Sequence, residues 1–317
     1  MQGKLATVFG ASGFIGRNIV RELAARGLRV NAVCRDAEHA KFLKPMGNVG
    51  QVTPMRADVT DAAAVARAVR GAAVVVNLVG ILYQSGRNTF EAVQATAPGT
   101  IAKAAAAAGA TAMVHVSAIG ADPDSRSVYA RSKAAGEAAV RAAFPAATVL
   151  RPSIVFGPDD SFFNRFAAMA LIMPVLPLIG GGLTKFQPVY VDDVADAALA
   201  ALEQGGASGV TYELGGPSVY TFRQLLELML AEIRRKRLLV PVPFCLASLE
   251  AAVLELLPAP PLTRDQVELL KRDNVVSAGM PALADLGIQA TPLEIILPTY
   301  MDKFRIGGRY AAGRAVA

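Results

Sequence analysis

The stretch VFGASGFIG, residues 8–16, contains three glycines spaced three residues apart. An apolar run at residues 5–9 leads into it and has the composition of a buried parallel strand. Apolar residues at helical spacing follow it as far as Gly27, a residue suited to a left-handed helix end. The pattern therefore predicts a strand, a tight turn and a helix within the first 27 residues.

A glycine turn between a strand and a helix is typical of dinucleotide binding. The first glycine permits the turn, the second lets a pyrophosphate approach the backbone, and the third lets the helix pack on the strand. The spacing is GxxGxxG rather than the commoner GxGxxG, but a second strand at residues 28–34 completes a βαβ unit. We therefore predict a dinucleotide site rather than a purely structural turn. The residues expected to line it here are Gly10, Ser12, Gly13, Phe14, Ile15, Gly16 and Arg17.

Strand and helix signals alternate through the first half of the chain. Strands are expected at residues 51–57, 73–78, 113–117 and 147–150, and helices at 61–71 and at 89–108, the last interrupted by Pro98. This order predicts an α/β fold, a Rossmann-type doubly wound parallel sheet with a smaller C-terminal substrate lobe. We expect an NAD(P)-binding domain at residues 1–155, its sheet completed by segments near 186–200, and a smaller substrate or partner lobe at 156–317.

The end of the second strand bears on which dinucleotide is bound. Cys34 occupies the place where a carboxylate would hydrogen-bond the adenosine ribose of NAD(H). Arg35 follows it, and two guanidiniums, those of Arg35 and Arg17, would clamp a 2′-phosphate. The pattern favours NADP(H) over NAD(H). In the alternative, both arginines are solvated and Asp36 holds the ribose.

Two further strand ends are expected to contact the cofactor. Asp58 and Val59 follow the third strand and are placed to meet the adenine, although Asp58 is also suited to a simple turn cap. Val79 and Gly80 follow the fourth strand, where a small residue lets the nicotinamide ring lie close.

A serine, a tyrosine and a lysine form the candidate catalytic set. Ser117 ends the fifth strand, and Tyr129 and Lys133 lie four residues apart, on one face of the following helix. The ammonium of Lys133 favours the phenolate of Tyr129 and can hold the nicotinamide ribose, so Tyr129 would act as acid or base. Ser117 would polarise the carbonyl or alcohol. The alternative is that YxxxK occurs by chance on an exposed helix.

Composition excludes several other classes of protein. The net charge of +6 in 317 residues lacks the concentrated basic and aromatic pattern of nucleic-acid binding. The cysteines, Cys34 and Cys245, are far apart, and with His39 and His115 they give neither a disulfide framework nor a zinc spacing. His115 is expected to be a core residue. Because the first strand begins by residue 4, we expect no targeting segment and a cytoplasmic protein.

Two apolar segments lie in the second half of the chain. Residues 166–180 are broken by prolines and too short to span a membrane. Residues 238–261 follow the basic run Arg234–Arg237 and carry Leu246, Leu249, Val253, Leu256 and Leu257 at helical spacing. A basic run beside such a helix is typical of a surface that rests on anionic lipid or on a membrane partner. The alternative is a core-facing helix, with the charges offsetting a helix dipole.

These motifs together resemble the short-chain dehydrogenase/reductase superfamily, in its extended or atypical branch, also known as the NAD-dependent epimerase/dehydratase superfamily. The segment 150–158, LRPSIVFGP, is similar to the one that lines the nicotinamide in extended members, and it implies cofactor contacts from Pro152 and Ile154. The segment 187–195, QPVYVDDVA, is similar to the strand and helix start that return the chain to the core.

A narrower resemblance is carried by short motifs spread over the chain. These are GFIGR at 13–17, HVS at 115–117, AFP at 143–145, FQPVYVD at 186–192, LTRDQV at 262–267 and LGIQATPLE at 286–294. They are similar to the family of subunit 9 of the complex I alpha subcomplex. That resemblance implies tightly held NADPH, an accessory role in respiratory NADH:ubiquinone oxidoreductase, and kinship with a protein of ubiquinone biosynthesis.

Two functions follow as hypotheses. In the first, the chain is an NADP(H)-binding accessory or assembly factor whose partners are respiratory complex I or a membrane surface, at the inner face of the bacterial inner membrane. In the second, it is a free-standing NAD(P)-dependent reductase, dehydrogenase or epimerase acting on a quinone precursor or another apolar carbonyl or alcohol. A quinone-like small molecule suits either hypothesis, and no nucleic-acid partner is expected.

Overall fold

A computed structural model describes residues 2–203 and 209–308 of the chain. The residues divide into two compact units. Unit 1 contains Met1–Pro152, Val191–Leu214 and Ser277–Gln289, and unit 2 contains Ser153–Tyr190, Gly215–Val276 and Ala290–Ala317. In the described part of the chain, each helix is too short or too polar to cross a membrane.

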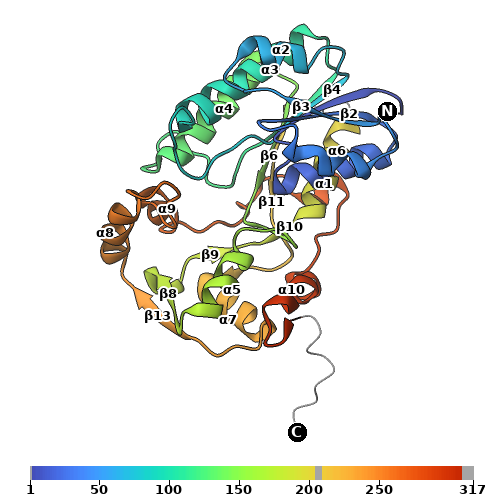
Figure 1. The fold of residues 1–317 in the computed structure, drawn as a ribbon. Coiled ribbons are helices and arrows are strands. Elements are labelled where there is room, and N and C mark those ends of the chain that lie inside the picture. The colour runs from blue at the N-terminus through green and yellow to red at the C-terminus, as the bar shows by residue number, and fades with distance from the viewer. Residues whose placement is uncertain (1, 204–208, 309–317) are drawn as a thin grey trace. The chain divides into compact units, whose positions relative to one another are not determined.

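Unit 1 is built on a seven-stranded sheet in the order β11-β6-β5-β4-β1-β2-β3, with every neighbouring pair parallel (Figure 1). The strands are β1 Leu5–Phe9, β2 Arg29–Cys34, β3 Val52–Arg56, β4 Val74–Asn77, β5 Ala112–Val116, β6 Thr148–Pro152 and β11 Thr211–Leu214. The strand order reverses between β1 and β4. At such a switch point the carboxyl ends of the strands leave room for a ligand.

Helices cover both faces of this sheet (Figure 1). They are α1 Phe14–Ala25, α2 Ala62–Ala68, α3 Ala97–Ala107, α4 Val128–Ala143 and α6 Val191–Glu203, with the shorter turns η1 His39–Met46, η2 Glu91–Thr96 and η4 Leu283–Leu286. One buried cluster joins Phe9, Val33 and Met113 of the strands to α2, α3 and α4. Helices α1 and α6 pack against each other on the other side. The predicted Rossmann-type doubly wound sheet is thereby confirmed.

Local expectations agree with these elements, with two corrections. The seventh strand is β11, whereas the segment near 186–200 forms helix α6 and the short strand β10, Val189–Tyr190, which pairs with β7, Val155–Phe156. Pro98 does not interrupt the helix at 89–108. It lies in the first turn of α3, where its missing N–H is tolerated, and the irregularity is the π-helical turn η2 before it.

Unit 2 surrounds its own core of phenylalanines and leucines, which includes Phe156, Phe163 and Phe222. Its helices are α5 Phe163–Ile172, α7 Phe222–Glu232, α8 Phe244–Leu254, α9 Arg264–Leu269 and α10 Leu293–Met301, with the turns η3 Gly180–Gly182 and η5 Asp302–Phe304. Two more pairs of strands complete it. They are β8 Val175–Ile179 with β13 Leu238–Val242 (parallel) and β9 Lys185–Phe186 with β12 Tyr220–Thr221 (antiparallel).

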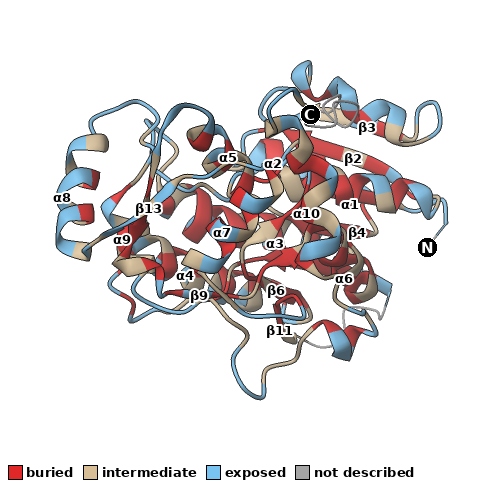
Figure 2. Ribbon diagram, turned by 90° about the horizontal axis from the view of Figure 1, so that it is seen from below, coloured by how far each residue is buried: buried red, intermediate tan, exposed pale blue. Residues whose placement is uncertain are grey.

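Burial separates the two predicted apolar segments of this unit. In α5 and β8, Ala167, Ala170, Leu176 and Leu178 are fully buried, so residues 166–180 contribute to the core. Helix α8 is different, because only Ala247 and Ala251 are buried in it, and Figure 2 shows much of it in the colour of exposed residues. The leucines and valine of residues 246–257 that were noted in the sequence are exposed, at 50–84%. The core-facing interpretation of these side chains is wrong.

Candidate functional site

The glycine turn joins β1 to α1 at the switch point of the sheet. Gly10 adopts φ +81°, and its amide donates to the carbonyl of Val33, as does the amide of Ala11. The amide of Gly13 donates to the carbonyl of Gly10 at 3.0 Å, and Gly13 then caps α1 without any side-chain hydrogen bond. The amides of the first helical turn have no partner inside the helix, so this end of α1 is suited to an anion.

Close backbone approaches explain why glycines occupy this turn. A Cβ added at Gly16 would lie 2.2 Å from the carbonyl oxygen of Gly10 and 2.8 Å from the Cα of Ala11. A Cβ added at Gly10 would lie 3.3 Å from the backbone of Leu78, the residue that follows β4. The turn after β1 and the end of β4 are therefore in contact. Around them, Ser12, Phe14, Ile15 and Arg17 are half-buried.

Strand β2 ends with Cys34, where an acid is typical of NAD(H) sites, and Arg35 follows it. The thiol of Cys34 is buried and donates to the carbonyl oxygens of Asp36, at 3.3 Å, and of Met55, so it does not offer a ribose partner. One carboxylate oxygen of Asp36 accepts from the amides of Glu38 and His39, which lowers the pKa of Asp36. Arg35 is exposed.

The two arginines predicted to bind a 2′-phosphate have different neighbours. The guanidinium of Arg17 lies 5.2 Å from the ring centroid of Phe42 and donates to the carbonyl of Ser12 at 3.4 Å. Arg35 is exposed and is close enough for its charge to act on Asp58, which follows β3. Hydrogen bonds from the amide and hydroxyl of Thr60 lower the pKa of Asp58, and the charge of Arg35 lowers it further.

Val59 and Val79 flank the same edge of the sheet and pack on the core of unit 1. The backbone amide of Val79 donates to the side-chain Oδ1 of Asn77 at 3.1 Å. The side-chain Nδ2 of Asn77 lies 3.1 Å from Nδ1 of His115. As expected, His115 is a core residue. It is 1% exposed, and burial lowers its pKa to about 3. Asn77 thus orients the turn that precedes Gly80.

Lys133 lies among the other predicted catalytic elements. Its ammonium donates to the carbonyl of Val116 at 3.4 Å, next to Ser117, and lies 5.9 Å from the ring centroid of Tyr129. A Cβ added at Gly80 would lie 3.3 Å from the same ammonium. Burial lowers the pKa of Lys133 to about 8, although the charge of Glu137 opposes this shift. The structure therefore gathers Gly80, Lys133 and Tyr129 beside the end of β5.

Ser117 has a buried hydroxyl available for a ligand. It is 4% exposed, its amide donates to the carbonyl of Leu150, and its Oγ has no hydrogen-bond partner within residues 2–203 and 209–308. A buried hydroxyl without a partner is costly, so a donor or acceptor on a bound molecule would satisfy it. Tyr129 is half-buried in the first turn of α4, with its ring against the edge of Phe90.

Gln94 is a site residue that sequence reasoning missed. It is 1% exposed, its side-chain oxygen accepts from the amide of Ile81 at 2.9 Å, and its nitrogen donates to the hydroxyl of Ser132 at 3.0 Å. Ser132 in turn donates to the carbonyl of Tyr129 at 2.7 Å. Gln94 thereby links the loop after Gly80 to the first turn of α4. It lies in the π-helical turn η2, a feature often found at functional sites, and its one sequence signal was a glutamine amid alanines.

An ion-pair network near Lys133 joins two buried carboxylates to the half-buried Arg151. Arg151 donates two hydrogen bonds to Glu137, at 2.9 and 2.7 Å, and lies 3.6 Å from Glu213 of β11. Glu213 also accepts from the amide of Ser277 at 2.8 Å. The network ties α4 to β6 and β11, and so fixes the helix that presents Lys133.

Two predicted cofactor contacts belong to different units. Pro152 ends β6 in unit 1, where its carbonyl accepts from the amide of Ile119 at 3.0 Å. Ile154 lies in unit 2 and packs on the core around Phe156. Within unit 1, then, the predicted residues lie at the carboxyl ends of strands β1 to β6 and on helix α4.

Comparison with known proteins identifies the class that this fold and site define. Residues 6–215 match the model of the NAD dependent epimerase/dehydratase family, and the chain belongs to that family. Across 97% of its length it is 38% identical to NADH dehydrogenase [ubiquinone] 1 alpha subcomplex subunit 9, mitochondrial, of Arabidopsis thaliana, covering 80% of that protein. The family resemblance expected from the sequence motifs is therefore confirmed.

Two further similarities extend this comparison. The chain is 34% identical to a ceramide reductase of Caulobacter vibrioides over 62% of its own length and 60% of that protein. Among solved structures, MoeE5 in complex with UDP-glucose and NAD is similar in fold, with a TM-score of 0.71 and 18% identity, covering 94% of this chain and 97% of that one.

Proposed function

We propose that this chain is an NADP(H)-binding accessory or assembly subunit associated with respiratory NADH:ubiquinone oxidoreductase. The observation that carries the proposal is the 38% identity to alpha subcomplex subunit 9, because it extends over 97% of the chain and so includes unit 2 as well as the nucleotide fold. Nucleotide folds serve many functions, whereas similarity in the second unit is more specific. The partner proposed on this basis is complex I, and a quinone-like molecule is the small-molecule candidate.

The glycine turn fits the diphosphate of a nicotinamide nucleotide. Gly10, Gly13 and Gly16 leave no side chain between the backbone and a ligand, and the uncapped first turn of α1 offers its amides. When bound, the nucleotide supplies hydride chemistry. The residues of the chain bind and orient it, with Gly80 leaving room beside Lys133, whose ammonium is placed for the nicotinamide ribose.

NADP(H) is the preferred form in this proposal. Position 34 is a cysteine rather than an acid that would repel a 2′-phosphate, and Asp36 already accepts hydrogen bonds from two backbone amides. Arg35 is exposed at the same strand end, and Arg17 lies at the glycine turn. Arg35→Ala should weaken NADPH binding by tenfold or more and leave NADH binding nearly unchanged, measured by calorimetry. Arg29→Ala, at the opposite end of the same strand, is the matched control.

The accessory role can be tested by extraction from the native membrane. In mild detergent the protein should co-migrate with complex I activity, and its bound NADPH should resist oxidation by added quinones. Recovery of all the protein as a free monomer would contradict the accessory role. A failure to bind any nicotinamide nucleotide would contradict the cofactor assignment independently of partner binding.

A second candidate function, an NAD(P)-dependent reductase acting on an apolar carbonyl or alcohol, is favoured by one observation. Within the described part of the chain, the buried Oγ of Ser117 has no hydrogen-bond partner. Lys133 lies next to it, and its lowered pKa of about 8 suits it to tune a neighbouring phenol near neutral pH. In this role Ser117 orients the substrate oxygen and Tyr129 transfers the proton. Tyr129→Phe should then abolish turnover and retain the nucleotide. Undiminished turnover in that variant would remove Tyr129 from the mechanism.

A further inference from the structure

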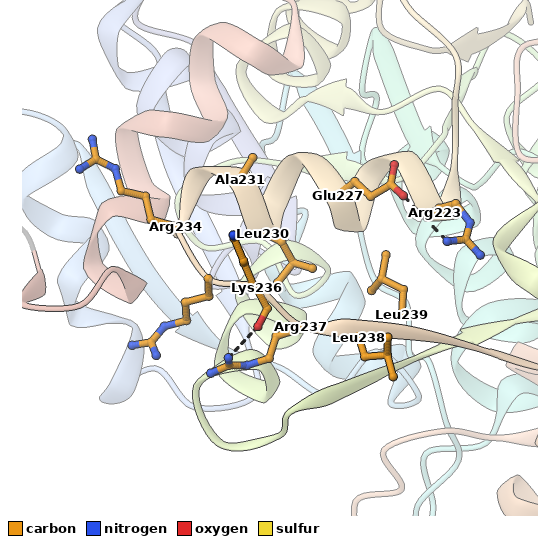
Figure 3. A pocket seen from close by; sticks show the side chains of 10 residues that line it. Arg223, Glu227, Leu230, Ala231, Arg234, Lys236, Arg237, Leu238 and Leu239 are labelled. Carbon is orange, nitrogen blue, oxygen red and sulfur yellow. Dashed lines mark hydrogen bonds and ion pairs between the residues drawn. The ribbon is translucent and has the colours of Figure 1, made fainter.

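Unit 2 carries a basic cavity that the nucleotide site does not explain. The cavity has a volume of about 740 Å³ and lies between α7 and β13. Leucines and an alanine form its apolar lining, and one acid, Glu227, accompanies the cations. Figure 3 shows the guanidiniums of Arg223 and Arg234 at its two ends with leucine side chains between them. Its lining residues are Arg223, Glu227, Leu230, Ala231, Arg234, Arg235, Lys236, Arg237, Leu238 and Leu239.

Arg223 lies 3.9 Å from the carboxylate of Glu227, whereas the cations at positions 234–237 form no ion pair within residues 2–203 and 209–308. Arg235 donates to the backbone carbonyl of Phe304 at 3.1 Å, and Arg237 donates to the carbonyl of Ala170 at 2.8 Å. Backbone carbonyls orient these side chains without cancelling their charge. Arg234 and Lys236 are exposed. The cavity is therefore suited to an anion, and its apolar lining is suited to a ligand that has both a charged and an apolar part.

Exposed apolar residues adjoin the cavity. Leu238, which lines it, is 64% exposed, and its amide donates to the carbonyl of Pro174 at 3.0 Å. That contact brings the end of α5 alongside, where Ile172 is 88% exposed and Met173 is 42% exposed. Large apolar side chains thus lie next to the cations at positions 234–237.

The outer face of α8, the helix that follows β13 along the chain, is a second exposed apolar surface of unit 2. Leu246, Leu249 and Val253 are 56%, 67% and 63% exposed, whereas the buried side of α8 consists of Ala247 and Ala251, packed near Val267. A surface helix ordinarily turns its large apolar residues inward, and α8 does the opposite. At eleven residues, or about 16 Å, it is too short to cross a bilayer of about 30 Å and is suited to lie along its surface.

We infer that the basic cavity and the outer face of α8 dock unit 2 on an anionic phospholipid bilayer, with a lipid phosphate headgroup in the cavity. The charge commits the surface to this occupant, since cations beside exposed leucines match the phosphates and acyl chains of lipid at one boundary. A protein partner would need carboxylates against the same cations. The inference goes beyond the proposed function and does not depend on nucleotide binding.

Co-sedimentation of the full chain with vesicles tests the inference. The protein should bind vesicles containing phosphatidylglycerol and not vesicles of phosphatidylcholine alone, and binding should weaken as salt is raised. Each basic residue near an anionic surface contributes about fivefold, so Arg234→Glu with Lys236→Glu should weaken binding at least about 25-fold. Lys44→Glu with Arg70→Glu makes the same change in net charge on exposed residues of unit 1 and should bind nearly as wild type.

A second pair of variants tests the apolar part. Leu249→Ser with Val253→Ser should weaken vesicle binding severalfold, whereas Val49→Ser with Ile295→Ser, which are also highly exposed, should not. Equal binding by test and control variants, or equal binding to neutral and anionic vesicles, would overturn the inference.

Two other ligands, a free phosphate and a second copy of the chain, would give different experimental results, and either result would also overturn the inference of membrane docking. Inorganic phosphate that binds the protein and blocks vesicle binding at constant ionic strength would assign the cavity to a free phosphate. A dimer in light scattering that the Leu249→Ser, Val253→Ser protein loses, with no vesicle binding by wild type, would assign α8 to a second copy of the chain.

Discussion

Gly136 lies at a close approach between α4, the helix that presents Tyr129 and Lys133, and η2, the π-helical turn that presents Gln94. A Cβ added at Gly136 would lie 2.1 Å from the carbonyl oxygen of Gln94. Side-chain Cβ atoms do not approach other atoms within 3.0 Å, so α4 and η2 must separate by about 0.9 Å in Gly136→Ala. The obstacle is backbone, which cannot rotate out of the way as a flexible side chain can.

Two opposing contributions set the expected change in the free energy of unfolding of Gly136→Ala. Overpacking of this kind costs about 3 kcal/mol, the upper end of its usual range, because no side chain can relieve it. Alanine in place of glycine within a helix returns about 1 kcal/mol. The net loss is therefore about 2 kcal/mol, and for a unit of about 190 residues this corresponds to a fall of roughly 4–8 °C in Tm.

Thermal unfolding followed by circular dichroism measures this change, with Ala135→Gly as the matched control. Ala135 is an exposed neighbour on the same helix, and its replacement reports the helix-propensity term alone, a loss of about 1 kcal/mol. Nucleotide affinity should fall in Gly136→Ala, because the separation displaces Lys133, and should be unchanged in the control. A Tm for Gly136→Ala equal to or above that of wild type would refute the close approach of the two helices.

Three further predictions concern buried polar groups. The pKa of Lys133 is lowered to about 8 from its ordinary 10.5, so between these two pH values Lys133 binds a proton in the unfolded chain but not in the folded one. Lys133 therefore makes the free energy of unfolding rise with pH across that window. In Lys133→Met, the free energy of unfolding measured with urea should change less with pH there than in wild type. Glu137→Gln removes the doubly hydrogen-bonded partner of the half-buried Arg151, which keeps Glu213, and should cost about 1–3 kcal/mol. Glu203→Gln, in an exposed pair, should cost less than about 1 kcal/mol. Equal losses in urea titrations would contradict the difference in burial. Tyr300→Phe removes a 2.6 Å hydrogen bond to the buried Asp160 and should lower the free energy of unfolding of unit 2 by about 1–3 kcal/mol. A Tm equal to that of wild type would show that this hydrogen bond does not stabilise the unit.

The ion-pair network explains how a buried lysine is tolerated at the end of β5. Lys133 is 5% exposed, and the nearby carboxylate, Glu137, is itself held by Arg151, which also faces Glu213. Each charge in this series lies next to one of opposite sign, which reduces the desolvation cost of burying it. Burial lowers the pKa of Lys133 to about 8, and the charge of Glu137 opposes this shift, so the ammonium stays mostly charged near neutral pH.

Local order along the chain was determined by the sequence itself. The strand at residues 5–9, the left-handed glycine at 27 and the cap at Asp61 all follow from propensities and hydrogen bonds within a few residues. The positions of Ser117 after a strand and of Tyr129 and Lys133 on one helix were also predictable, because they depend on local sequence, whereas their catalytic role stays a prediction. These features needed no knowledge of distant contacts.

Other features were decided by tertiary structure alone. The seventh strand is β11 rather than the segment near 186–200, because pairing depends on which edge of β6 is open and not on local composition. The π-helical turn at Gln94 and its contact with Gly136 arise where two helices meet, and the exposure of the leucines of α8 depends on the small area that α9 covers. Periodicity shows that a helix has an apolar face, but only packing decides whether another element covers that face.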